Sequence, residues 1–298
     1  MQVFYTDRFT LPLPQGHRFP SQKYRLLRER VTDSPWIHGH QLIEPEAISR
    51  DDLVRAHDAL YVERVLRGDL SAAEVRRIGF PWSEAMVERS LRATGATYMA
   101  TLAAMRDGRA VTLAGGTHHA CIDHGEGYCV FNDCAVAAFA MHAIGVARRV
   151  LVIDLDVHQG NGTADIMQQH EWCYTFSMHA AKNYPFRKIA GDCDIEFADG
   201  TSDDEYLDTL HTALEYVWAA SRPDLVYYLA GADPYAGDGL GRLALTKKGL
   251  LQRDQMVLDR VRLEGTPLVV TMAGGYGIDI MDTVDIHYQT VMQVVTRW

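Results

Sequence analysis

An apolar run ends in acidic and imidazole side chains at every second position, Asp154, Asp156 and His158. A spacing of two places them on one face for as long as the strand continues. Two carboxylates at a buried strand end are costly unless a cation neutralises them. With Asp233, which follows another apolar run, they offer the carboxylate and imidazole ligands that suit zinc, iron(II) or manganese. These residues predict a metal site that leaves coordination positions open for water and substrate.

Two adjacent histidines and one tyrosine are the candidates for acid–base chemistry beside such a metal. His118 and His119 follow a Gly-Gly turn, and a histidine titrates near neutrality, so it can take a proton from activated water and pass it to a leaving amine. Asp154 and Asn161 can accept hydrogen bonds from the far ring nitrogens and fix the tautomers. Tyr276 also follows a Gly-Gly pair, and its hydroxyl can hydrogen-bond the oxyanion of a tetrahedral intermediate.

Short apolar runs in the sequence precede these side chains and would position them. Such runs are too short for helices and rich in Val, Leu, Ile and Tyr, so they predict buried strands. The four runs are Ala110–Leu113, Val150–Leu155, Leu225–Ala230 and Leu268–Met272. Each leads directly into a polar or glycine-rich cluster. Since ligands bind at the carboxyl ends of the strands in open α/β sheets, we expect the clusters to meet at one edge of a parallel sheet.

Helical segments lie between the runs, as expected for a parallel sheet covered by helices. We predict a helix from Ser83 to about Met105, and one capped by Asn132 or Asp133 that continues to about Val146. Ser202-Asp203-Asp204-Glu205 reads as a capping box for a helix that must stop before Pro223. Thr246 can cap a helix that ends near Gly265. For the first eighty residues we expect loops and short helices.

Composition narrows the class of protein. The 298 residues carry a formal net charge of −10, which argues against nucleic acid as a partner and is compatible with a cationic or neutral substrate. No secretory signal and no apolar run long enough to span a membrane are visible. The five cysteines include no Cys-x-x-Cys pair, and an odd number of reduced thiols predicts a cytoplasmic protein.

The order of the motifs resembles that of the arginase/deacetylase superfamily, in its histone deacetylase-like branch. The motifs that carry the resemblance are Gly115–Ala120, Gly127–Asp133, Asp154–Gly162, Gly231–Asp233 and Gly274–Tyr276. Within that branch, His158–Gly162 and Phe176–His179 are most similar to class IV and its bacterial relatives. The resemblance implies a single domain over residues 1–298, with an eight-stranded parallel sheet flanked by helices, and the activity of a zinc-dependent deacylase.

The resemblance also implies a role for each matching residue. Asp156, His158 and Asp233 would bind zinc. His119, oriented by Asn161, would be the general acid/base, while His118, paired with Asp154, would act electrostatically and Tyr276 would polarise the acyl carbonyl. A structural potassium ion would be held by Asp154, Asp156, His158, Ser177 and Met178. The acyl-lysine tunnel would be lined by Gly127, Tyr128, Phe186, Gly274 and Gly275.

Two departures from the family pattern bear on the substrate. The rim segment Ile78–Trp82 has no acid of the kind that clamps a peptide backbone in class I enzymes, and the second histidine has Asn161 rather than Asp as its partner. A neutral amide cannot raise the basicity of that histidine as a carboxylate would. The substrate stays open between acyl-lysine in proteins or peptides and small acylated amines such as polyamines. Apolar residues assigned to the rim favour a hydrophobic acyl chain or a small molecule; they are Phe80, Trp82, Tyr184 and Phe186.

Two other functions compete with the deacylase. An arginase-like hydrolase would hold two manganese ions and would need further carboxylates around the second ion. A catalytically silent acyl-ligand binder, similar to acetoin-utilisation proteins, would be expected to lack a metal ligand, the histidine pair or the tyrosine.

Overall fold

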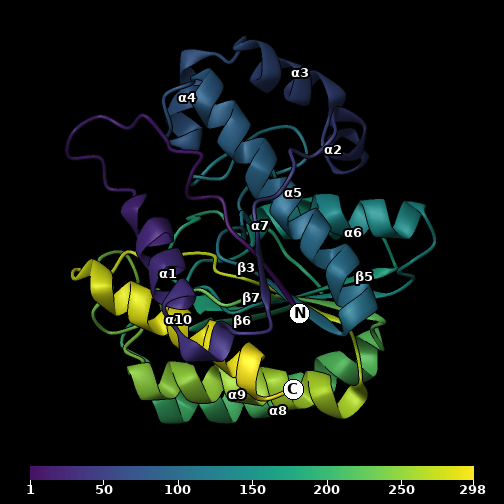
Figure 1. The fold of residues 1–298 in the computed structure, drawn as a ribbon, viewed down its shortest axis with the longest axis vertical. Helices are drawn as coiled ribbons and strands as arrows, with labels where there is room; N and C mark the ends of the chain where they lie inside the picture. Colours follow the sequence, from purple (N-terminus) through teal and green to yellow (C-terminus); the bar gives the residue numbers. More distant parts are fainter.

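An eight-stranded parallel sheet crosses the middle of the computed structural model, which describes residues 1–298 (Figure 1). Its strand order is β2-β1-β3-β8-β7-β4-β5-β6, and every neighbouring pair is parallel. The strands are β1 (Gln2–Phe4), β2 (Gln41–Ile43), β3 (Arg109–Thr112), β4 (Val150–Asp154), β5 (Cys173–Ala180), β6 (Cys193–Phe197), β7 (Leu225–Leu229) and β8 (Leu268–Thr271). The four predicted strands are β3, β8, β7 and β4, which are neighbours at the centre of the sheet. The predicted α/β fold with an eight-stranded parallel sheet is confirmed.

Helices cover both faces of the sheet (Figure 1). One layer contains α1 (Gln22–Thr32), α8 (Asp203–Ser221), α9 (Lys247–Glu264) and α10 (Ile280–Thr296). The other contains α2 (Arg50–Ala56), α3 (Ala59–Arg67), α4 (Ala72–Ile78), α5 (Glu84–Asp107), α6 (Asp133–Ala143) and α7 (Asn161–Met167). Alternate residues of β7 enter the two apolar cores, Val226 and Tyr228 on one side and Leu225 and Tyr227 on the other. Burial on both faces explains why the central strands read as unbroken apolar runs.

Most of the predicted helix starts agree with the structure. Ser83 accepts a hydrogen bond from the Met86 amide at the start of α5, and Thr246 accepts one from the Gly249 amide at the start of α9. Asn132, not Asp133, caps α6, which ends at Ala143 and so is shorter than predicted.

The predicted capping box at the start of α8 is wrong, although the helix begins at Asp203 as expected. The Ser202 side chain makes no capping hydrogen bond. The Asp203 carboxylate instead accepts hydrogen bonds from the backbone amide and the hydroxyl of Thr246, at 2.8 and 2.6 Å. Three acidic residues in the first turn already complement the helix dipole, so the helix starts without the box.

The first eighty residues contain two strands as well as the expected loops and short helices. β1 lies between β2 and β3, and each of β1 and β2 has only three residues. Three residues are too few to show a hydrophobic alternation, so the sequence does not reveal such a strand. Its pairing partners are supplied by distant parts of the chain. No helix in the structure is long and apolar enough to cross a membrane. All five cysteines are unpaired.

Candidate active site

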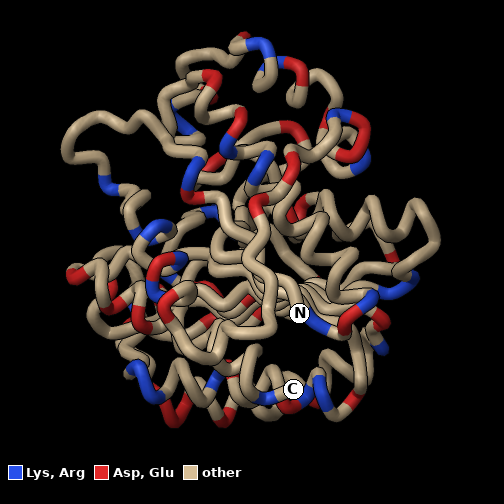
Figure 2. Tube along the Cα trace, in the orientation of Figure 1, with Lys and Arg blue, Asp and Glu red and all other residues tan.

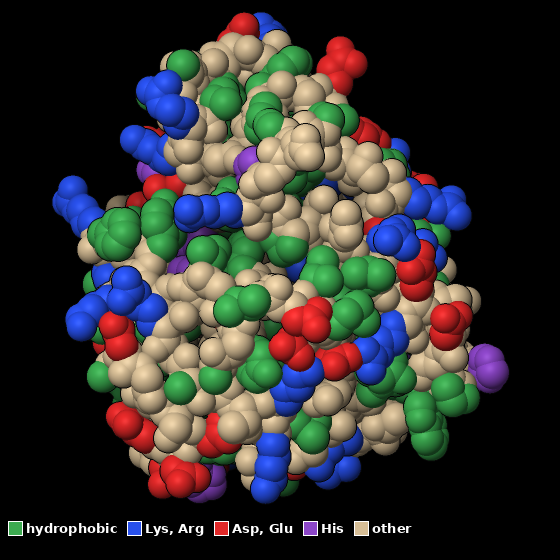
Figure 3. Space-filling view, turned by 90° about the vertical axis from the view of Figure 1, so that its left-hand side faces the viewer, with side chains coloured by type: hydrophobic (Ala, Val, Ile, Leu, Met, Phe, Trp, Pro, Cys, Tyr) green, Lys and Arg blue, Asp and Glu red, His purple; other side chains and the backbone are tan.

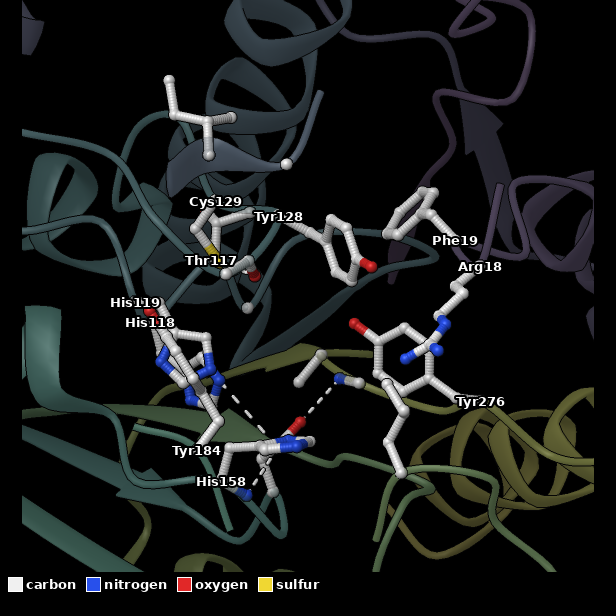
Figure 4. Close-up of a pocket in the computed structure, with 18 of the residues that line it drawn as sticks. Arg18, Phe19, Thr117, His118, His119, Tyr128, Cys129, His158, Tyr184 and Tyr276 are labelled. Atoms are coloured by element: carbon white, nitrogen blue, oxygen red, sulfur yellow. Dashed lines mark hydrogen bonds and ion pairs between the residues drawn. The ribbon is translucent and has the colours of Figure 1, made fainter. Parts of the chain in front are cut away.

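A cavity of about 580 Å³ opens at the carboxyl ends of the central strands (Figure 4). Among the predicted site residues, those that line it are His118, His119, Gly127, Tyr128, Asp156, His158, Phe186, Gly274 and Tyr276. Asp154, Asn161 and Asp233 lie behind this wall and bond to residues that form it. Gly275 does not line the cavity; its carbonyl accepts a hydrogen bond from Lys23. The strand-end arrangement thus brings distant segments together as predicted.

The predicted metal ligands form one compact group. Suitable donor atoms of Asp156, His158 and Asp233 all lie within 4.8 Å of one another, and all three residues are buried. The Nδ1 atom of His158 is 2.9 Å from Asp156 Oδ1 and 3.3 Å from Asp233 Oδ2. One imidazole nitrogen therefore faces two carboxylates, which is a ligand set of the kind that binds zinc.

The hydrogen bonds around this group fit a cation. Asp233 Oδ1 accepts a bond from the Val157 amide at 2.9 Å, but Asp233 Oδ2 is buried without a hydrogen bond and has only the 3.3 Å ion-pair contact with His158 Nδ1. A buried carboxylate oxygen that lacks a partner is costly. A metal ion at this point would satisfy it. The residues present therefore fit the metal that the sequence predicts.

Glycines make room for the two carboxylates. A Cβ atom at Gly274 would fall on the Asp233 carboxylate, and one at Gly231 would lie 2.6 Å from Asp156 Oδ2. The Gly274 amide donates a hydrogen bond to Asp156 Oδ2 at 2.6 Å. These two glycines are therefore required by close approach of the ligand carboxylates.

The pKa values of the two carboxylates in this group are shifted in opposite directions. Burial, together with the neighbouring Asp156 carboxylate, raises the pKa of Asp233 to about 7. Burial would also raise the pKa of Asp156, but His118 and His158 outweigh it and hold that pKa well below its usual value. A bound divalent cation would keep both carboxylates ionised.

The two adjacent histidines have different partners. His118 Nδ1 lies 2.6 Å from Asp154 Oδ2, and His119 Nδ1 lies 2.7 Å from Asn161 Oδ1. Burial alone would lower the pKa of His118, but the carboxylates of Asp154 and Asp156 raise it to about 9. Burial and the neighbouring imidazoles push the pKa of His119 well below its usual value. The neighbours of the two adjacent histidines thus shift their pKa values in opposite directions, upward for His118 and downward for His119.

The Asn161 amide is itself bound by a carboxylate, which sequence reasoning missed. Asn161 Nδ2 donates a hydrogen bond to Glu126 Oε1 at 2.6 Å. Burial would raise the pKa of Glu126, but hydrogen bonds from His124, Asn161 and Tyr184 more than offset it and lower that pKa. Glu126 is therefore an anion that contacts Asn161, the hydrogen-bond partner of His119. Its position directly before the Gly127-Tyr128 motif was the only available signal.

Hydrogen bonds to Asp133 stabilise the loop that carries the histidine pair. The Asp133 carboxylate accepts hydrogen bonds from the amides of Gly116 and Thr117, at 3.0 and 2.7 Å. Gly116 has φ +74°, and a Cβ atom there would lie 2.7 Å from Ala273. The first residue of α6 thus fixes the turn after β3, and Gly116 lets that turn approach the turn after β8.

Tyr276 enters the cavity from the turn after β8, and its hydroxyl points into the cavity (Figure 4). Its backbone amide donates a hydrogen bond to Asp238 Oδ2 at 2.6 Å. The ammonium of Lys23 lies 5.3 Å from the Tyr276 ring centre and bonds to the carbonyls of Ala273 and Gly275. Burial raises the pKa of Tyr276 well above its usual value, so the hydroxyl keeps its proton.

Aromatic rings form the walls of the cavity. Tyr128, whose φ is +66°, lies with its ring 5.3 Å from Phe19 and 6.1 Å from Tyr276. Tyr184 stands edge-on to His119 at 4.9 Å, while Phe186 is 90% exposed at the opening. Phe19 was missed because it belongs to the N-terminal segment, whose loop carries no local signal of its destination.

Two of the residues assigned to an apolar rim lie elsewhere. Phe80 is buried and stacks on Tyr128, and Trp82 donates a hydrogen bond to the Val65 carbonyl. Neither lines the cavity. The α4 helix ends in a left-handed Gly79, which turns these side chains inward. The apolar rim is therefore smaller than predicted, and Tyr184 and Phe186 are its remaining members.

A buried arginine connects the two strands that are followed by the predicted metal ligands. Arg253 of α9 donates hydrogen bonds to the carbonyls of Leu155 and Gly231, at 3.2 and 2.7 Å, and pairs with Asp254 at 2.8 Å. The carbonyls belong to the segments after β4 and β7. Sequence reasoning missed this residue, since an arginine on a helix is normally exposed.

Of the residues assigned to potassium, Asp154 lies on β4, Ser177 and Met178 lie on β5, and Asp156 and His158 follow the end of β4. Asp154 is paired with Ser177 in the strand register, and Met178 follows it in β5. The Ser177 hydroxyl lies 2.9 Å from His179 Nδ1.

Comparison with known proteins gives consistent matches. A family model for the histone deacetylase domain matches residues 17–291. An uncharacterized protein of Picosynechococcus sp. is 40% identical over 285 residues, which cover 96% of this chain and 95% of that protein. Histone deacetylase 2 of Arabidopsis thaliana is 31% identical over 292 residues, covering 93% of this chain and 74% of that protein. The crystal structure of an HDAC homolog complexed with SAHA superposes with a TM-score of 0.83 at 21% identity, over 99% of this chain and 83% of that one.

Proposed function

Because this chain belongs to the histone deacetylase family, we propose that it hydrolyses the amide bond of an acylated lysine or a related acylated amine. The observation that carries the proposal is the meeting of three metal-ligand side chains, a histidine pair and a tyrosine hydroxyl at one cavity. In the reaction, water adds across the C–N bond and releases a carboxylate and an amine.

Asp156, His158 and Asp233 are proposed to hold zinc. When bound there, zinc would supply Lewis acidity toward the acyl carbonyl and toward the attacking water. The unpartnered Asp233 Oδ2 supports this assignment.

His119 is proposed as the general base and then the general acid. Its Nδ1–H donates to Asn161 Oδ1, so the other ring nitrogen is left without a proton and can accept one from the attacking water. The same proton can pass to the leaving amine. His118, which is hydrogen-bonded to Asp154, is proposed to stabilise the negative charge that develops beside it.

Tyr276 is proposed to stabilise the oxyanion. Its hydroxyl keeps its proton because burial raises the pKa, and a protonated phenol donates a hydrogen bond to the developing negative charge. Asp238 and Lys23 both bond to the peptide unit that joins Gly275 to Tyr276.

The proposal extends to a structural potassium ion beneath the zinc site, held by Asp154, Asp156, His158, Ser177 and Met178. The β4–β5 register, which sets Asp154 beside Ser177, supports this group. It also includes a cytoplasmic location, where the five free cysteines stay reduced.

The competing functions have less support. The other group of ligand-type residues, Cys121, His124 and Glu126, shares no member with the first and contains a single carboxylate. That set is poor for the second of two manganese ions, which prefer oxygen ligands. A silent binder would not need the ligands, the histidine pair and the tyrosine that this chain retains together.

Turnover of a fluorogenic acetyl-lysine peptide tests the proposal. Activity should be abolished by a chelator and restored by zinc, and metal analysis should find one zinc per chain. His119→Ala should lose activity by orders of magnitude while keeping its metal. Two manganese ions per chain would favour the arginase-like function, and no turnover of any acylated amine would favour a binding protein.

A further inference from the structure

The wall of the active-site cavity carries a charge opposite to that of the whole chain. Acidic residues outnumber basic ones in the sequence, 39 to 29. Among the residues that line the cavity, Asp156 is the only acid, and it lies at the metal site. The basic residues of the wall are Arg18, Lys23, Arg76, Arg77, Arg89, Lys182 and Arg242.

Most of these cations are exposed and have few carboxylate partners. Arg18, Arg76 and Arg77 are exposed and form no ion pair, while Lys182 and Arg242 share a single carboxylate, Asp199, at 3.7 and 3.1 Å. In Figure 3, Lys and Arg side chains lie around a recess at the left of the view, in which a histidine is visible. The trace in Figure 2 shows acidic residues in every part of the molecule. The basic wall is therefore a local feature.

The cations come from separate segments. Arg18 lies in the loop before α1, Arg76 and Arg77 in the last turn of α4, and Lys182 and Arg242 in the loops after β5 and β7. A pair of arginines at a helix C-terminus is explained by the helix dipole alone. That explanation does not cover the other segments, which converge on the same opening.

Arg89 and Lys23 extend the positive potential toward the interior. The Arg89 guanidinium lies 4.7 Å from the Tyr24 ring centre and 5.8 Å from that of Phe19, and it has no ion pair. Lys23 is buried beside Tyr276 and bonds only to carbonyls. Clefts lined by charge of one sign, with walls of low dielectric constant, concentrate oppositely charged ligands and raise their association rates.

We infer that the substrate of this site carries carboxylate groups near its acylated amine, held by the basic wall while the acyl group reaches the metal. This inference rests on the proposed deacylase function and narrows its substrate class. Acidic peptide segments and N-acylated amino acids both present this chemistry. Polyamines and Lys/Arg-rich peptide tails present the opposite charge and would be repelled.

The test compares substrates that differ only in charge. Three acetyl-lysine peptides of equal length carry Asp and Glu, Ser and Gln, or Lys and Arg at the flanking positions. One additional pair of substrates, Nα-benzoyl-Nε-acetyl-lysine as free acid and as methyl amide, distinguishes a small acid from an acidic peptide. We expect kcat/KM to favour the acidic peptide or the free acid over its neutral match by about tenfold at low salt. The preference should collapse at about 0.5 M salt, where surface charges are screened.

Substitution of arginines in the cavity wall tests whether these residues cause the preference for acidic substrates. The triple variant Arg18→Gln, Arg76→Gln, Arg77→Gln should bring the acidic-to-neutral ratio of kcat/KM close to one. The matched control, Arg148→Gln, Arg149→Gln, Lys248→Gln, removes the same charge from exposed residues outside the cavity and should keep the ratio. Circular dichroism checks that both variants are folded.

Three outcomes would contradict the inference. Equal turnover of acidic, neutral and basic peptides would overturn it and leave the deacylase function standing. Loss of the preference in the control triple as well would show that only overall charge matters. No turnover of any acylated amine would overturn the proposed function, and the inference with it.

Discussion

The imidazole of His119 depends on a carboxylate that it does not contact. Asn161 accepts a hydrogen bond from His119 through its oxygen and donates one to Glu126 through its nitrogen, at 2.7 and 2.6 Å. The sequence suggested that a neutral amide leaves this histidine without carboxylate support. In the structure the amide transmits part of that support, because hydrogen bonds in a chain polarise one another.

Replacement of Glu126 should therefore alter catalysis through Asn161. Glu126→Gln is expected to lower kcat by about tenfold, the size of effect seen for outer partners of site residues, with a small change in KM. Removal of the negative charge also lowers the pKa of His119 further, so the acidic limb of the kcat–pH profile should move to lower pH.

The control for this variant is Asp123→Asn, which removes one charge from an exposed side chain of the same segment. Its pH profile should match that of the parent protein. An unmoved acidic limb in Glu126→Gln would contradict the role given to Glu126.

The hydroxyl of Tyr276 is expected to act mainly in the transition state. Tyr276→Phe should lower kcat by about 100- to 1,000-fold, the cost of removing one oxyanion donor, while zinc content stays unchanged. Tyr216→Phe, at an exposed tyrosine outside the cavity, is the control. Full activity of Tyr276→Phe would exclude the proposed role.

At the scale of elements, α9 stabilises the strand ends that carry the predicted metal ligands. Arg253 is fully buried and reaches the carbonyls that follow β4 and β7. The ion pair with Asp254 gives the guanidinium its counter-charge, and Tyr228 and Thr290 also bond to that carboxylate. These hydrogen bonds connect the strand ends at the site to the helical layer that contains α9.

Removal of this arginine should destabilise the whole domain. Arg253→Met leaves Asp254 as a buried unpaired charge, and such changes cost about 3–5 kcal/mol of unfolding free energy. Denaturant unfolding measures the loss, and Arg262→Met, on the exposed face of the same helix, should change stability little. A second substitution, Asp254→Leu, should recover part of the loss; equal stability of Arg253→Met and the parent would contradict this account.

At the scale of the whole molecule, charge is distributed unevenly. A net charge of −10 is compatible with a cationic or neutral substrate, whereas the cavity wall is basic. Net charge describes the average field at a distance, whereas a ligand inside a cleft responds to the side chains around it. The net charge of the chain therefore does not describe the charge of the cavity wall.

Acid stability is a second property of the whole molecule. Burial lowers the pKa of His57 to about 4 and that of His179 to about 3, against an ordinary value of 6.5. Below about pH 6.5 the unfolded chain takes up these protons and the folded chain does not, so stability is full above pH 6.5 and falls as the pH drops toward 4. His57 alone should account for roughly 3 kcal/mol over this range.

Urea unfolding at pH 7 and pH 5 should show this loss, and NMR titration should give a pKa for His57 well below its ordinary value of 6.5. His57→Gln should flatten the pH dependence, whereas His38→Gln should not. A His57 pKa near 6.5 in the folded protein would contradict the assignment.

The sequence by itself determined the centre of this protein. The strands β3, β4, β7 and β8 and the donor set of Asp156, His158 and Asp233 were predicted because apolar runs, their polar ends and ligand types are local features. The rule that parallel strands end at one edge was enough to bring the donors together.

Tertiary structure alone decided the periphery. The three-residue strands β1 and β2, the entry of Phe19 into the cavity, and the links made by Glu126 and Arg253 all depend on partners far away in the chain. The positive charge at the cavity opening also depends on tertiary structure, since its cations come from segments that only folding brings together. Local patterns cannot encode such contacts, because their free energy arises from neighbours that the sequence order does not show.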